Sequence, residues 1–119
     1  HHPQGQYPGT DSLYFEADKN LIGIAKKLYP DLKTVTCASA DKFVADPNEK
    51  RAISAKFSAD ICEMESAGIL ITCNRNNIPC LMIKTVSDSV EGGKEEFDLQ
   101  VEASANVCFD ITDNIIKLL

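Results

Sequence analysis

The hydrophobic positions of this chain form short segments with either helical or extended spacing, separated by polar turns. Residues 18–30 have helical spacing, with Asp18 placed to cap the first turn and Pro30 placed to end the last one. The apolar positions of this predicted helix are Leu21, Ile22, Ile24, Ala25 and Leu28.

Three further helices are predicted. Asp46, Pro47 and Glu49 form a typical helix start, and we expect the helix to run to about Lys56. The next helix covers 66–76, and its apolar content suggests that it is largely buried. A long helix runs from Phe97 to Leu119 with a stripe made of Val107, Ile111, Ile115 and Leu118.

Extended segments alternate with these helices. Residues 33–40 are rich in β-favouring side chains, 59–63 form a brief apolar run, and 78–86 are almost continuously apolar. The last segment is expected to be a central strand covered on both faces. This alternation predicts an α/β fold with helices on a largely parallel sheet of three strands, in one domain over 1–119.

Composition excludes several classes of function. The 119 residues carry a net charge of -6, which argues against nucleic acid as a partner. No apolar run approaches the roughly 18 residues of a membrane span, and no signal peptide opens the chain, so we expect a cytoplasmic protein that does not bind membranes. The five cysteines form no C-x-x-C pair and predict reduced thiols, with no metal site or cofactor. His1 and His2 do not suffice to identify a tag.

Carboxylates follow two of the predicted strands. Glu63 ends the 59–63 segment, Glu65 lies two residues beyond it, and Asp88 follows 78–86. Because ligands bind outside the carboxyl ends of strands in open α/β sheets, these acids are expected to share one site.

For each of these acids and for two aromatic residues, the residue type is compatible with a functional role and with a purely structural one. A carboxylate of Glu63 or Glu65 suits a vicinal diol, although Glu65 could instead stabilise the start of the following helix. A buried carboxyl group tends to keep its proton, which would make Asp88 a proton donor, although Asp88 could simply cap a turn. Phe43, with Val44 beside it, and Phe97 could bind a flat ring or fill the core.

Five blocks of this sequence, in order and spacing, resemble those of the methylthioadenosine/S-adenosylhomocysteine nucleosidases, within the nucleoside phosphorylase superfamily. The resemblance spans essentially the whole chain and implies part of a three-layer α/β fold with a central mixed sheet and flanking helices. The blocks are Gly5-Gln6-Tyr7-Pro8-Gly9, Phe15-Glu16-Ala17-Asp18, Ala40-Asp41-Lys42-Phe43-Val44, Glu63-Met64-Glu65-Ser66-Ala67 and Val86-Ser87-Asp88.

The resemblance implies hydrolysis of the N-glycosidic bond of 5'-methylthioadenosine or S-adenosylhomocysteine by water, which releases adenine and a thio-ribose. It implies that Asp88, oriented by Ser87, protonates the purine N7. The substrate would be bound by Glu63 and by Glu65 and Met64, the last two holding the ribose, and by Val44, Phe43 and Phe97 around the adenine. Pro8 would reach the pocket of the neighbouring subunit in a homodimer.

Two departures from the family pattern bear on these expectations. Lys84 stands where the family has an arginine, which weakens any bidentate contact there. The chain also resembles the carboxyl-terminal half of such an enzyme, so the water-activating glutamate is expected to lie in the other half. A purine nucleoside phosphorylase and a non-catalytic nucleoside-binding or dimerisation fragment remain alternatives.

Overall fold

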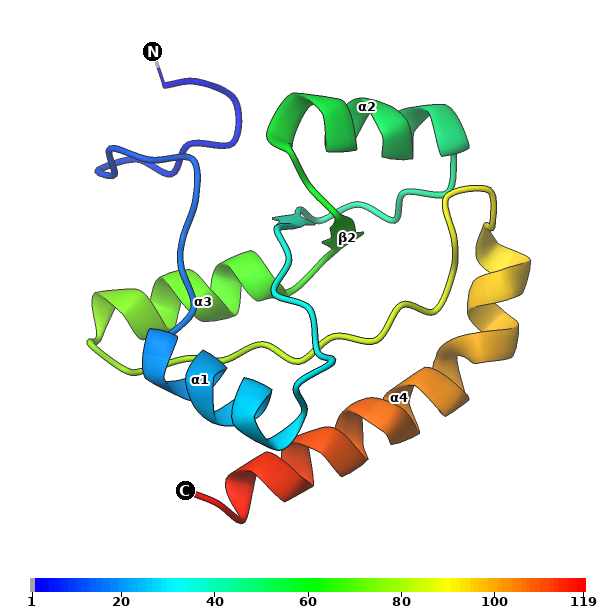
Figure 1. Cartoon of the computed structure of the whole chain (residues 1–119). Helices are drawn as coiled ribbons and strands as arrows, with labels where there is room; N and C mark the ends of the chain where they lie inside the picture. Colours follow the sequence, from blue (N-terminus) through cyan, green and yellow to red (C-terminus); the bar gives the residue numbers. More distant parts are fainter. Residues whose placement is uncertain (1) are drawn as a thin grey trace.

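The computed structural model describes residues 2–119, so His1 lies outside the described residues. Within the described residues 2–119, four helices and two short strands follow one another (Figure 1). They are α1 (Lys19–Leu28), β1 (Cys37–Ser39), α2 (Pro47–Phe57), β2 (Ile61–Glu63), α3 (Ser66–Arg75) and α4 (Lys94–Ile116).

The first two helices begin where the sequence predicts, because an aspartate caps each of them. Asp18 Oδ1 accepts a hydrogen bond from the Leu21 amide at 2.9 Å, and Asp46 Oδ1 accepts one from Asn48 at 2.9 Å. Each carboxylate satisfies one of the amides that a helix leaves without an internal partner and also opposes the positive end of the helix dipole. Both predicted caps are confirmed.

The sheet consists of β1 and β2, which pair in parallel with Cys37 opposite Ile61 and Ser39 opposite Glu63. Only the last part of the predicted 33–40 strand therefore joins the ladder. Just before it, the Asp60 carboxylate accepts a hydrogen bond from the Thr36 amide at 2.9 Å. The parallel register places the ends of both strands at the same edge, where the candidate site residues begin.

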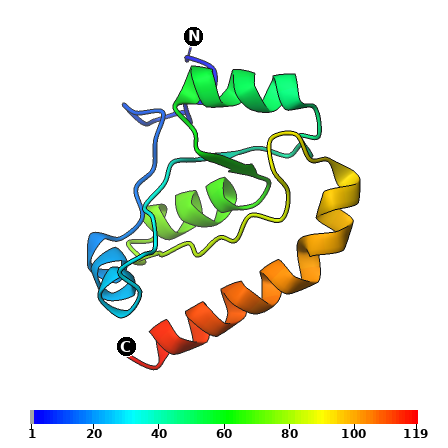
Figure 2. The same cartoon turned by 45° about the vertical axis from the view of Figure 1, so that its right-hand side comes forward.

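The prediction of a third, central strand at 78–86 is wrong for the described residues. This segment runs extended between α3 and α4 (Figures 1 and 2), but it forms no ladder with β1 or β2. Its Cys80 carbonyl accepts a hydrogen bond from the Asp18 amide at 2.8 Å, and Thr85 Oγ1 lies 2.8 Å from Cys108 Sγ of α4. Apolar residues favour an extended, covered backbone, but a strand also requires an aligned neighbour.

Few of the described residues are buried, and two predictions about helix burial need correction. Helix α3 is not largely buried, because Ile69 is 50% exposed. Helix α4 starts and ends three residues earlier than predicted; on it Ile115 is buried and Val107 is exposed, and Leu118 lies exposed beyond its end. The buried apolar residues are Ala25, Ala59 and Ile115.

Residues 2–119 contain no helix that combines the length and the apolar character needed to cross a bilayer.

Candidate active site

Glu63, at the end of β2, is tied into the backbone of the next helix. Its carboxylate accepts hydrogen bonds from the amides of Glu65 and Ser66 at 2.9–3.0 Å, and Lys84 Nζ lies 2.9 Å from Oε2. Burial alone would raise the pKa of Glu63, but hydrogen bonds from Ser39, Lys84 and the two amides outweigh burial and lower this pKa to about 2. Glu63 is therefore an ionised carboxylate that already has its partners.

Glu65 differs from Glu63 although it lies two residues away. It is the N-cap residue of α3, yet its side chain makes no capping hydrogen bond, because Glu63 serves the first amides of the helix. The Glu65 side chain is exposed and makes no hydrogen bond or ion pair within residues 2–119. Glu65 therefore stands at the start of α3, as the alternative expects, but it makes no capping hydrogen bond, and its carboxylate is open to a ligand.

Asp88 is held by one hydroxyl group and one ammonium group. Ser87 Oγ donates a hydrogen bond to Oδ1 at 2.9 Å, and Lys50 Nζ of α2 lies 2.8 Å from Oδ2. The side chain of Asp88 is 17% exposed, so it is largely covered as expected, but it is ion-paired and not isolated among apolar groups. Through this hydrogen bond the Ser87 hydroxyl group can orient the Asp88 carboxylate.

Lys50 is the part of this site that sequence reasoning missed. It lies in the first turns of α2, 38 residues before Asp88, in a stretch of charged residues that reads as a solvated helix face. Its side chain is only 9% exposed. The available sequence signal was indirect: a lysine four residues after Asp46 lies one helical turn above the capped end of the helix.

The two aromatic residues named from the sequence lie together. The rings of Phe43, in the loop after β1, and Phe97, in the first turn of α4, meet edge to face with centroids 5.6 Å apart. Phe43 is 42% exposed and Met64 is 37% exposed, so both present apolar surface to solvent, while Val44 is partly covered. This arrangement leaves an aromatic surface available for a flat ring.

Pro8 belongs to a different part of the molecule. Its carbonyl accepts a long hydrogen bond of 3.5 Å from Arg75 Nη2 at the end of α3, and the Arg75 guanidinium lies 4.9 Å from the centroid of the Tyr7 ring. Pro8 itself is exposed, as is Gly9 beside it. The loop therefore presents Pro8 outward from this chain.

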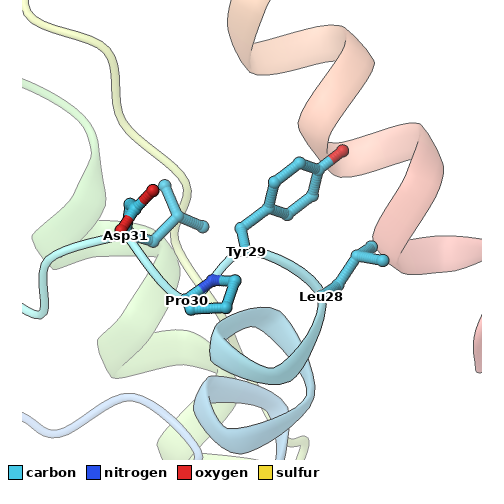
Figure 3. A pocket seen from close by; sticks show the side chains of 5 residues that line it. Leu28, Tyr29, Pro30 and Asp31 are labelled. Atoms are coloured by element: carbon cyan, nitrogen blue, oxygen red, sulfur yellow. The ribbon is translucent and has the colours of Figure 1, made fainter.

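Two surface hollows lie away from these residues. One is formed by residues 28–32, where the Tyr29 ring points toward α4 (Figure 3) and its hydroxyl accepts a hydrogen bond from Asn114 Nδ2 at 2.7 Å. The other lies between 16–18, the end of α3 and 77–80. Neither hollow includes a residue of the candidate site. Within residues 2–119, no three His, Cys, Asp or Glu side chains are grouped so that they could hold a metal ion.

Comparison with known proteins shows the family of this chain. Residues 2–117 match the model of the phosphorylase superfamily. The aminodeoxyfutalosine nucleosidase of Campylobacter jejuni is 35% identical over 101 residues, which cover 82% of this chain and 43% of that protein. The 5'-methylthioadenosine/S-adenosylhomocysteine nucleosidase of Bacillus velezensis is 33% identical over 123 residues, covering 95% of this chain and 52% of that protein.

Solved structures agree with the sequence comparison. The futalosine hydrolase of Helicobacter pylori superposes with a TM-score of 0.93 at 28% identity, over 99% of this chain and 52% of its own. A Helicobacter pylori 5'-methylthioadenosine/S-adenosylhomocysteine nucleosidase gives the same TM-score and identity over 99% and 53%. The α/β fold class predicted from the sequence is confirmed, and the chain spans about half the length of the relatives it matches. The chain belongs to the phosphorylase superfamily, and these relatives within it are nucleosidases.

Proposed function

We propose that this chain forms the base-binding and leaving-group part of a nucleosidase, which hydrolyses the N-glycosidic bond of 5'-methylthioadenosine or S-adenosylhomocysteine without a cofactor. The observation that carries the proposal is the unequal state of the two glutamates at the end of β2. Glu63 has its hydrogen-bond partners within the chain. The Glu65 carboxylate, by contrast, is open and can accept hydrogen bonds from both hydroxyl groups of a ribose.

The remaining residues fit the chemistry of a departing purine. As the bond between C1' and the base nitrogen breaks, its electron pair moves into the base, and Asp88 donates a proton to N7. The positive charge that develops on the ribose is stabilised by Glu65, with Met64 against the sugar. Phe43 and Phe97 pack on the adenine, the Val44 backbone binds its edge, and Ser87 orients Asp88.

Completion of the reaction requires groups that this chain does not supply. Water adds to C1' and gives up a proton to a base, which we assign to the part of the relatives' fold that the chain does not span. Residues 1–119 would then be the carboxyl-terminal part of a single domain. Exposed Pro8 would enter the pocket of a second copy in a homodimer.

The names of the relatives favour a second candidate substrate. Two nucleosidase activities appear among them, and the Campylobacter jejuni relative is named for aminodeoxyfutalosine. Its base-binding and ribose-binding requirements would fall on the same residues. Both classes of nucleoside therefore belong in the test.

The test is incubation of the full-length protein that carries this sequence with each nucleoside, in the presence and in the absence of phosphate. Chromatography quantifies the released base and identifies the sugar. Free sugar formed without phosphate supports the nucleosidase, whereas release that requires phosphate and yields a sugar 1-phosphate identifies a phosphorylase. If no base is released and an adenosine-type transition-state analogue does not bind, the catalytic and binding proposals both fail, and a structural role remains.

A further inference from the structure

The side chain of Lys50 crosses from α2 to the loop that follows Asp88. Its ammonium group lies 2.8 Å from Asp88 Oδ2, 2.6 Å from the Ser89 carbonyl oxygen and 2.8 Å from the Gly92 carbonyl oxygen. These three acceptors match the three N–H donors of a lysine ammonium group. Figures 1 and 2 show this loop passing close to the first turns of α2 before it enters α4.

The burial of Lys50 makes this arrangement specific. At 9% exposure, the charge could not be removed from water at acceptable cost without partners, and all three partners come from one five-residue loop. By contrast, Lys56, six residues later on α2, is exposed and contacts the side chain of Gln4. Lys50 is thus distinguished from Lys56, the other lysine of α2, by the loop that it binds.

A second element, α4, contacts the same loop through Glu96. Glu96 Oε2 of α4 accepts hydrogen bonds from the amide and the hydroxyl group of Ser89, both at 3.1 Å. The Gly92 amide closes the turn onto the Ser89 carbonyl at 3.2 Å. The loop after Asp88 is therefore held between a cation on α2 and an anion on α4.

We infer that Lys50 is a positioning residue for Asp88, which holds the 88–92 loop and with it the orientation of the Asp88 carboxylate. The inference rests on the proposed function for its catalytic consequence, but not for its structural one. Lys50 binds Oδ2 and Ser87 binds Oδ1, so the plane of the carboxylate is fixed from two sides. Each oxygen keeps a second lone pair for a proton.

The inference predicts two measurable effects of Lys50→Met, which keeps an unbranched side chain of nearly the same length and removes the ammonium group. Amide hydrogen exchange at Ser89 and Gly92 should accelerate by about tenfold or more, because the loop loses three hydrogen bonds. In the full-length protein kcat should fall by about 10- to 100-fold with little change in KM, because the acid is misplaced while the contacts of the substrate remain. Lys50→Arg should recover part of both.

Lys56→Met is the matched control, because it makes the same substitution on the same helix and should leave both measurements unchanged. Lys50→Gln gives the same comparison if the methionine variant does not fold. Exchange at Ser89 and Gly92 no faster than in the Lys56→Met control would overturn the inference. An unchanged kcat in a full-length protein that is otherwise active would overturn its catalytic part. If the unsubstituted protein releases no base, the proposed function fails, and the exchange measurement still decides whether Lys50 holds the loop.

Discussion

Lys84 Nζ lies 2.9 Å from Glu63 Oε2, and this ion pair joins the extended 78–86 segment to the end of β2. The Glu63 side chain is 15% exposed and that of Lys84 33%. The same carboxylate holds the first amides of α3, so one side chain connects a strand, a helix and the segment that leads to Asp88. Lys84, which stands where the family that the sequence resembles has an arginine, thus makes a single charged contact with Glu63.

The pKa of Glu63 makes stability depend on pH in the acid range. Because this pKa is about 2 in the folded protein against 4.5 ordinarily, the stabilisation is fully present above about pH 4.5 and is lost as the pH falls toward 2. We expect Glu63→Gln to lower the free energy of unfolding by about 1–2 kcal/mol at pH 7, after allowance for solvent screening. Urea denaturation at pH 7 and at pH 3 measures the effect.

The control for this experiment is Glu102→Gln on the exposed face of α4, which should leave stability almost unchanged. The difference between Glu63→Gln and the unsubstituted protein should shrink as the pH approaches 3. A difference of the same size at both pH values would contradict the assignment of a lowered pKa to Glu63.

Ser66, at the start of α3, offers a test of buried polarity. It is 7% exposed, and its hydroxyl oxygen has no hydrogen-bond partner within residues 2–119. Ser66→Ala removes this unsatisfied group and improves helix propensity, so the free energy of unfolding should rise by about 0.5–1 kcal/mol. Ser39→Ala should lower it by about 1 kcal/mol, because Ser39 Oγ accepts a hydrogen bond from the Ala67 amide. Denaturation curves of both variants test the contrast, and a loss of stability in Ser66→Ala would refute it.

The cysteines should differ in reactivity. All five are free; Cys62 in β2 is exposed, whereas burial, followed by the negative charge of Glu63, raises the pKa of Cys37 to about 12. Because the thiolate is the reacting species, a disulfide reagent at pH 8 should modify Cys62 rapidly and Cys37 slowly. Cys62→Ser should abolish the fast phase, and Cys37→Ser should leave it intact. Persistence of the fast phase in Cys62→Ser would show that another thiol is exposed.

The helices of this fold were predictable because their signals are local. Asp18 and Asp46 each lie within three residues of the amide that they cap, so the sequence alone identifies both starts. The 78–86 segment was not predictable in the same way. Its apolar composition indicates a covered backbone, but pairing into a strand depends on neighbours distant in sequence. The prediction that α3 is largely buried was wrong for the same reason, because burial depends on which residues pack against Ile69.

In the candidate site, too, the sequence indicates local features but not contacts between residues that are distant in sequence. Strand-end acids are visible in the sequence, but the two lysines that bind them are 38 and 21 residues away from their partners. Spacing also could not decide between the glutamates at the end of β2. That difference depends on Glu63 turning back onto the backbone of α3, which leaves Glu65 open.

The different roles proposed for Asp88 and Glu65 predict different kinetic defects in the full-length protein. Asp88→Asn removes the proton donor, so kcat should fall by about 100-fold or more while the ribose contacts preserve binding of a substrate analogue. Glu65→Gln should weaken that binding and also lower kcat, because its carboxylate contacts both the ribose hydroxyl groups and the developing charge. Steady-state kinetics and calorimetric titration with an adenosine analogue separate these effects.

A matched Asp98→Asn variant on the exposed side of α4 should be fully active, since its partner Lys94 lies on the same helix. Unaltered turnover in Asp88→Asn would refute its role as the leaving-group acid, and unaltered analogue binding in Glu65→Gln would refute the ribose assignment.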